Sequence, residues 1–178
     1  MDEIAAGSSS GGVRILGVVR GETGKLKEGF GKMGLIVPWC DQLKMLSHPC
    51  VGGFWTDCGW NSIREGVFAG MPFLSFPIGM DQITNSKSIE EDFKIGWRVR
   101  KETRRVEILV KRDAIMELLR KFVDMESIEV KEMRKRAKNL QELYENAIAE
   151  APNPSFGTLL NILSGHRAAS KNIHDSSV

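Results

Sequence analysis

Residues 39–82 read WCDQLKMLSHPCVGGFWTDCGWNSIREGVFAGMPFLSFPIGMDQ, and this stretch decides the fold. Its apolar run Val51–Trp55 has the length of a buried strand, and a helical pattern begins at Asn61 after a turn at Gly59. The stretch therefore predicts a strand, a glycine turn and a helix N-terminus. Because the first N–H groups of a helix lack acceptors and lie at the positive end of its dipole, such a turn best holds a phosphate or diphosphate.

Short apolar runs alternate with helical patterns on both sides of this turn. We predict strands over residues 13–19, 35–37, 51–55, 73–76 and 97–100, and helices over 42–46, 61–69 and 81–93. Gly70 is the predicted C-cap of the helix over 61–69, and Ser8–Gly12 is predicted to be flexible. The alternation indicates parallel pairing, and hence an α/β fold with a doubly wound sheet that binds ligands beyond the carboxyl ends of its strands.

The last third of the chain has a purely helical pattern. Apolar residues recur at helical spacing after Glu107, which predicts two helices that each bury one stripe, and Pro152 and Pro154 end the second. A further short helix is predicted over 156–163. We therefore expect one domain over residues 1–164, followed by a disordered tail over 165–178.

Composition excludes several classes of function. The formal net charge is +2, and acidic residues separate the basic ones, which does not fit nucleic-acid binding. The sequence has neither a basic leader with an apolar core nor a run of membrane-spanning length, so we expect a cytoplasmic protein. Cys40, Cys50 and Cys58, with His48 among them, lack the paired spacing of zinc ligands and are odd in number, so neither a metal site nor a disulfide framework is expected.

Two other phosphate-binding patterns are absent. The Gly21–Lys25 segment has the wrong residues before and after it for a P-loop. No strand is followed by G-x-G-x-x-G, which argues against an oxidoreductase that uses a nicotinamide cofactor.

The 44 residues from Trp39 to Gln82 resemble, over their whole length, the signature of plant secondary-product UDP-glycosyltransferases of family 1. The flanks extend this resemblance from about Met1 to Ala149. The resemblance implies the C-terminal, donor-binding half of a GT-B glycosyltransferase, with a Rossmann-like sheet. It also implies transfer of a sugar from a UDP-sugar donor to a small lipophilic acceptor without any other cofactor. Glucose is the expected sugar, because Gln at position 82 usually accompanies it.

The resemblance also assigns the uridine end of the donor. Trp39 would stack on the uracil, a contact worth roughly 1–3 kcal/mol, and the Cys40 backbone would serve the same base. Gln42 would reach the ribose, and Glu65 would accept its two hydroxyls. From the residues alone, the structural alternatives are favoured: Trp39 packs at a strand end, and Glu65 is a solvated residue in the first turn of a helix.

The remaining donor residues would contact the diphosphate and the sugar. The turn at Asp57 and Gly59, with Asn61 and Ser62, would face the diphosphate. Trp60 would line the sugar pocket, while Asp81 and Gln82 would hold the sugar hydroxyls. The structural alternatives are that Asn61 and Ser62 cap their helix, that Trp60 belongs to the core, and that Asp81 is the N-cap of its helix.

The chain departs from the family pattern in two respects. The family has His where this chain has Asp57, and a carboxylate about 4 Å from a phosphate costs roughly 4 kcal/mol at an effective dielectric near 20. The N-terminal acceptor domain, with its catalytic His and Asp, and the first strand of the donor domain have no counterpart in the sequence. His48 matches a structural position, and neither His166 nor His174, in the predicted tail, is a credible substitute base.

These departures lead to three expectations. The chain alone should be inactive, as a donor-binding fragment or pseudoenzyme. The alternative is a non-catalytic module that binds a nucleotide sugar. An uncovered sheet edge should also promote self-association.

Overall fold

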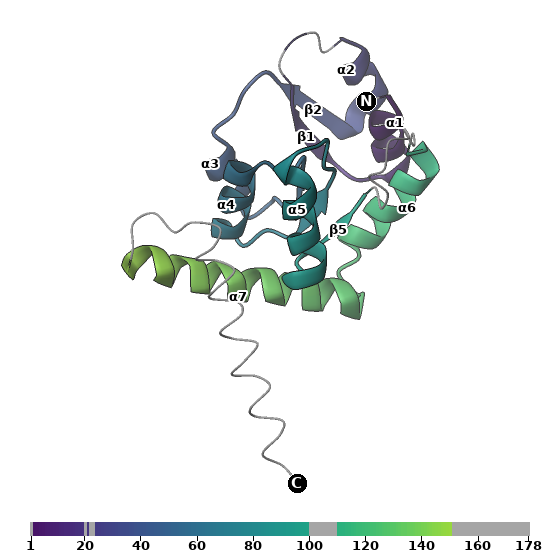
Figure 1. Cartoon of the computed structure of the whole chain (residues 1–178). Helices are drawn as coiled ribbons and strands as arrows, with labels where there is room; N and C mark the ends of the chain where they lie inside the picture. The colour runs from purple at the N-terminus through teal and green to yellow at the C-terminus, as the bar shows by residue number, and fades with distance from the viewer. Residues whose placement is uncertain (1, 20, 22–23, 100–109, 151–178) are drawn as a thin grey trace.

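A computed structural model describes residues 2–19, 21, 24–99 and 110–150 of the chain (Figure 1). Seven helices lie in this part: α1 (Asp2–Gly11), α2 (Gly24–Phe30), α3 (Gln42–Leu46), α4 (Trp60–Phe68), α5 (Asp81–Lys87), α6 (Arg112–Val123) and α7 (Ile128–Glu150). The strands of the same residues are β1 (Ile15–Val18), β2 (Gly34–Val37), β3 (Phe54–Thr56), β4 (Phe73–Ser75) and β5 (Gly96–Arg98). A 3₁₀ turn (Gly31–Met33) precedes β2, and a π turn (Ser88–Asp92) follows α5.

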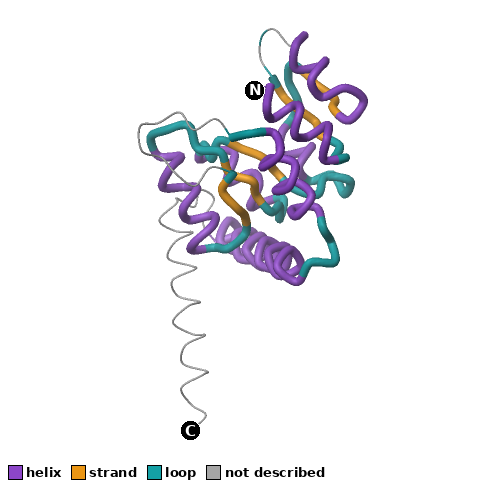
Figure 2. The backbone as a smooth tube through the Cα atoms, turned by 90° about the vertical axis from the view of Figure 1, so that its right-hand side faces the viewer, coloured by secondary structure: helices purple, strands orange, loops and turns teal. Residues whose placement is uncertain are grey.

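All strand pairs in the described residues are parallel, as the alternation predicts, but they form two sheets. β1 pairs with β2, while β3, β4 and β5 form a separate sheet in that order. Figure 2 shows the N-terminal pair of strands apart from the other three. In the part of the chain that the structure covers, no strand pairs with the second edge of β1 or of β3. The self-association expected from such edges stays a prediction.

The predicted elements differ from the observed ones mainly at their ends. The predicted helix over 42–46 coincides with α3, whereas the strand predicted over 51–55 begins at Phe54. The strand predicted over 13–19 is observed only over Ile15–Val18. It is partly buried and not fully buried as predicted, and Val18 is 50% exposed. Ala69 is the C-cap of α4, and Gly70 follows it with φ +66, the left-handed conformation that favours glycine.

The prediction that Ser8–Gly12 is flexible is wrong. Helix α1 continues to Gly11, and the buried Ser8 Oγ donates to Ile4 O at 2.7 Å. A Cβ on Gly7 would lie 2.7 Å from Arg112 O, so the small residues of α1 are what allow it to approach α6 closely. Glu3 Oε2 also accepts the Arg112 N–H at 2.7 Å, at the start of α6.

Two of the three apolar clusters among the described residues join the helices to the sheet of β3, β4 and β5. Helix α6 packs its Ile115, Leu119 and Phe122 against side chains from both sheets, including Ile15 of β1 and Leu74 of β4. The second cluster joins α4 and α7 to β4 and contains the buried Phe73 and Tyr144. Figure 1 shows α4 beside α7. Burying one such side chain stabilises the fold by about 1.5–3 kcal/mol, so the long helix α7 anchors the helix that carries the turn.

Several expectations concern residues outside the described ranges. These are the end of the strand predicted at Arg100, the helix over 156–163, the domain boundary at 164 and the tail with His166 and His174. Among the described helices, none combines the length and the apolar character needed to cross a membrane.

Candidate functional site

The predicted site residues follow the carboxyl ends of three strands. The loop after β2 carries Trp39 and Cys40 and leads into α3, which begins at Gln42. The turn after β3 leads into α4, and the loop after β4 leads into α5. Ligands of parallel α/β sheets bind at this end of the strands. The structure therefore presents the predicted residues on these loops and on the helices that follow them, and six of the residues form two hydrogen-bonded clusters.

The first group, which we call the Gln42 cluster, consists of Gln42, Ser62 and Glu65. Gln42 Nε2 donates to Glu65 Oε2 at 2.8 Å and lies 3.4 Å from Ser62 Oγ. All three side chains are half-buried. An amide and a carboxylate held side by side offer both donors and acceptors, so the cluster suits a ligand with adjacent hydroxyl groups.

The second group, which we call the Asp57 cluster, consists of Asp57, Gly59 and Gln82. Asp57 Oδ1 accepts the Gly59 N–H at 3.0 Å, and Asp57 Oδ2 accepts Gln82 Nε2 at 2.9 Å. Gln82 Oε1 in turn accepts the Ile78 and Gly79 N–H groups at 2.9 and 3.2 Å. Asp57 therefore already accepts the Gly59 N–H that an anion in front of α4 would use. It also accepts a hydrogen bond from the side-chain amide of Gln82.

The bend between these clusters depends on residues that the sequence analysis missed. Cys58 lies in the left-handed region with φ 69, and its N–H is accepted by Thr56 Oγ1 at 3.2 Å. The buried Asn85 donates from Nδ2 to Cys58 O at 3.0 Å. Burial raises the pKa of the Cys58 thiol to about 12, so this thiol stays neutral. Asn85 lies in the mostly polar segment Asp81–Lys87, so the sequence carries no signal for this role.

The remaining predicted residues lie around the two clusters with differing exposure. The Trp39 indole is 68% exposed and available for stacking, Asn61 is exposed, and Cys40 is half-buried. Trp60 is half-buried and packs against the core, which supports the core alternative for this residue.

The capping alternatives for Asn61, Ser62 and Asp81 are wrong. Gly59 is the N-cap of α4 and Met80 that of α5, and neither cap makes a side-chain hydrogen bond. Asp81 lies in the first turn of α5, and its Oδ2 accepts a hydrogen bond from Asn85 Nδ2 at 3.3 Å.

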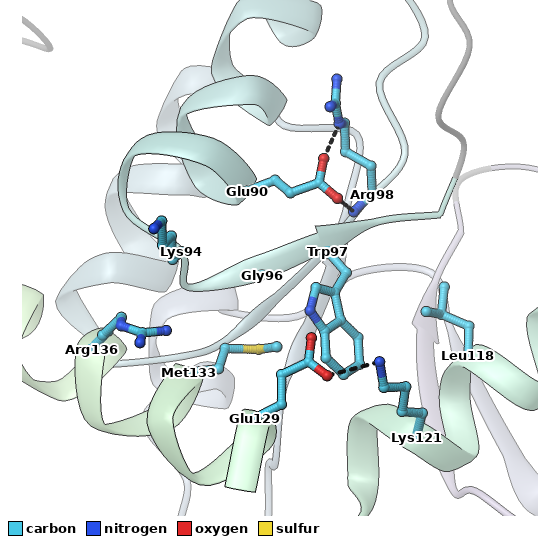
Figure 3. Close-up of a pocket in the computed structure, with 10 residues that line it drawn as sticks. All are labelled: Glu90, Lys94, Gly96, Trp97, Arg98, Leu118, Lys121, Glu129, Met133 and Arg136. Atoms are coloured by element: carbon cyan, nitrogen blue, oxygen red, sulfur yellow. Dashed lines mark hydrogen bonds and ion pairs between the residues drawn. The ribbon is translucent and has the colours of Figure 1, made fainter. Parts of the chain in front are cut away.

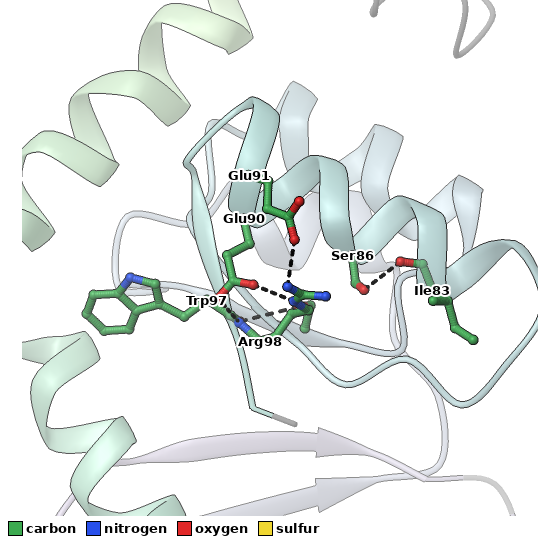
Figure 4. A network of polar contacts seen from close by, with 7 residues as sticks. Ile83, Ser86, Glu90, Glu91, Trp97 and Arg98 are labelled. Atoms are coloured by element: carbon green, nitrogen blue, oxygen red, sulfur yellow. Dashed lines mark hydrogen bonds and ion pairs between the residues drawn. The ribbon is translucent and has the colours of Figure 1, made fainter. Parts of the chain in front are cut away.

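A cavity of about 430 Å³ lies elsewhere, between β5, α6 and α7 (Figure 3). Trp97 forms its floor with Lys121 Nζ 4.6 Å from the ring, and that ammonium is also 2.8 Å from Glu129. Arg98 is bound by Glu90 and Glu91 from the turn after α5 (Figure 4). Because these ion pairs already satisfy Lys121 and Arg98, and none of the predicted residues lines the cavity, we place the candidate site at the strand ends.

A family model described as UDP-glucoronosyl and UDP-glucosyl transferase matches residues 3–103. The chain belongs to this family. It is 48% identical to UDP-glycosyltransferase 87A2 of Arabidopsis thaliana over 152 residues, which cover 85% of this chain and 33% of that protein. It is 39% identical to UDP-glycosyltransferase 74E2 of the same plant, over 84% of this chain and 33% of the relative. The chain thus spans about a third of the length of these family members.

Solved structures of plant family members have the same fold. Os79 of O. sativa, in complex with UDP, matches with a TM-score of 0.74 and 29% identity over 92% of this chain and 35% of Os79. UGT71G1 of Medicago truncatula, complexed with UDP-glucose, matches with a TM-score of 0.71 and 29% identity over 90% of this chain and 34% of that enzyme. The α/β architecture with parallel strands is therefore that of a GT-B glycosyltransferase.

Proposed function

We propose that this chain is the donor-binding part of a UDP-glycosyltransferase, with UDP-glucose as its ligand. The observation that carries the proposal is the Gln42 cluster, in which residues 20 and 23 positions apart in sequence meet beside the N-terminus of α4. The solved relatives named above contain UDP or UDP-glucose, which supports the same class of ligand for this chain.

Each part of the donor has a counterpart in the site. The exposed Trp39 indole offers a face for the uracil, and the Gln42 cluster would exchange its internal hydrogen bonds for bonds to the ribose hydroxyls. The N-terminus of α4 suits the diphosphate. Asp81, exposed at the start of α5, would accept a sugar hydroxyl, while Gln82 would first have to leave Asp57.

The proposed reaction is direct displacement at the anomeric carbon of the sugar, with inversion, by an acceptor hydroxyl. Such a displacement needs a general base within hydrogen-bond reach of that hydroxyl. No histidine belongs to either cluster, and His48 is engaged with Cys50 on the loop before β3. We therefore propose that these 178 residues bind the donor without transferring the sugar, and that an acceptor-binding domain supplies the base.

The Asp57 cluster favours a second candidate, a non-catalytic module that binds a nucleotide sugar. Asp57 places a negative charge on the amide that a diphosphate would use, and it engages Gln82. Both effects weaken the diphosphate and sugar contacts and leave the uridine contacts intact. The two candidates share a ligand and differ in turnover, so binding and transfer must be measured separately.

Calorimetric titration with UDP-glucose and ADP-glucose tests the shared part of the proposal. We expect the chain to bind UDP-glucose in preference to ADP-glucose, and Trp39→Ala to weaken binding by roughly 1–3 kcal/mol because the stacking face is lost. Met125→Ala, which removes another exposed apolar side chain away from the site, is the matched control and should leave binding unchanged. Equal affinity for the two nucleotide sugars, or equal effects of the two variants, would overturn the proposal.

A further inference from the structure

The loop between α3 and β3 brings a thiol and an imidazole together at the protein surface. Val51 N donates to His48 O at 2.9 Å and closes a turn over His48, Pro49 and Cys50. Within this turn His48 Nδ1 lies 2.8 Å from Cys50 Sγ. Both side chains are exposed, and neither belongs to the clusters of the candidate site.

The backbone determines which nitrogen of His48 faces the thiol. Cys50 N–H donates to His48 Nδ1 at 3.2 Å, so this nitrogen carries the lone pair and the proton of the neutral ring is on Nε2. The same lone pair lies within hydrogen-bond reach of Sγ. A nucleophile beside a base that a third group orients is the arrangement by which proteins activate cysteine.

The loop also lies against a cation on α7. A Cβ added to Gly52, two residues after Cys50, would be 3.7 Å from Arg134 Nη2. Arg134 Nε is buried without a hydrogen-bond partner among the described residues. Arg134 therefore lies beside this loop at Gly52, two residues after Cys50.

The other two cysteines of the chain have different surroundings. Cys58 is fully buried, and burial raises the pKa of its thiol to about 12. Cys40 is half-buried. All three cysteines are free thiols, so Cys50 has no disulfide partner, and the described residues include no group of three or more potential metal ligands.

We propose that Cys50 is a nucleophilic thiol activated by His48, and that the His48–Cys50 turn is a site of covalent modification by α,β-unsaturated carbonyl compounds. In this addition Sγ forms a bond to the β-carbon while the carbon–carbon π bond breaks. The thiol proton passes to His48 Nδ1, and the enolate takes a proton from there or from water at its α-carbon. The reaction needs no oxidant, no leaving group and no second cysteine. This inference is independent of the proposed donor site.

The test compares the three cysteines within one chain. The protein is treated with methyl vinyl ketone, quenched at intervals, digested and analysed by mass spectrometry for the modified fraction of each cysteine peptide. We expect Cys50 to react at least about tenfold faster than Cys40, because general-base catalysis contributes that much or more, and Cys58 to stay unmodified while the protein is folded.

His48→Asn is the matched variant. An Asn side-chain oxygen can accept the Cys50 N–H and preserve the turn, but it is not a base. The Cys50 rate should fall to that of Cys40, while the Cys40 rate, measured in the same sample, stays unchanged. The pH profile of the Cys50 rate should also differ between His48→Asn and the wild type, which a purely structural role of His48 would not produce. A Cys50 rate no higher than that of Cys40, or a ratio that His48→Asn leaves unchanged, overturns the proposal.

Discussion

The Gln42 and Asp57 clusters are built from the same stretch of sequence, yet they are prepared for a ligand to different degrees. In the Gln42 cluster the side chains bond one another, at 2.8 Å between Gln42 and Glu65, and hydroxyl groups of a ligand can replace that bond. In the Asp57 cluster a carboxylate occupies the Gly59 amide in front of α4, and Gln82 is bound to both Asp57 and the backbone. We propose that one half of this nearly complete family signature can receive its ligand, and that Asp57 blocks the other half.

The largest expected effect is the absence of turnover, because recognition by the Gln42 cluster does not supply a base. Incubation of the chain with UDP-glucose and a panel of flavonoid and terpenoid alcohols should give no glycoside detectable by liquid chromatography and mass spectrometry. A sample without protein sets the background. Product above that background would mean that the described site transfers sugar unaided.

Alkaline pH should weaken the bend that carries the Asp57 cluster. The pKa of the Cys58 thiol is about 12 in the folded chain and near 9.0 without burial. Its contribution to stability is therefore complete below pH 9 and decreases by roughly 1.4 kcal/mol per pH unit above it, since only the unfolded chain releases the proton.

Urea unfolding of the wild type and of Cys58→Ala between pH 8 and 11 measures this effect. The variant should lose less stability than the wild type over that range, whatever its absolute stability. Parallel pH dependences of the two proteins would show that the buried thiol does not contribute.

Removing the Glu65 side chain tests the proposed role of the Gln42 cluster in binding the ribose. Glu65→Ala deletes the proposed acceptor for two ribose hydroxyls, and hydrogen bonds to charged groups contribute about 1.5–3 kcal/mol each. We expect uridine and UDP to lose affinity equally, by about 3 kcal/mol. Glu142→Ala, at an exposed position of α7, is the control. A loss confined to UDP would place Glu65 near the phosphates and not near the ribose.

The sequence predicted the architecture better than the connections within the site. The parallel pairing and helix α3 follow from local periodicity, whereas the location of the site stays a prediction that rests on the direction of the strands. The continuation of α1 through Ser8 was not predictable, because it depends on the close approach of Gly7 to α6. The Asp57–Gln82 bond joins residues 25 positions apart, and only the folded loops bring them together. The charge of Asp57 was evident from the sequence, whereas its hydrogen bond with Gln82 was not.

The central claim is that Asp57 closes the phosphate half of the site and leaves the uridine half open. Calorimetric titration of UDP and uridine into the wild type, Asp57→His and Asp57→Asn tests it directly. Asp57→Asn removes the charge but keeps an oxygen for the Gly59 N–H. UDP should bind more tightly to Asp57→His by on the order of 1–3 kcal/mol, less than the bare Coulomb energy because solvent and salt screen an exposed carboxylate. Asp57→Asn should give a smaller gain in UDP affinity, and uridine should bind all three proteins alike. An equal response of UDP and uridine, or no response of UDP, would contradict the account.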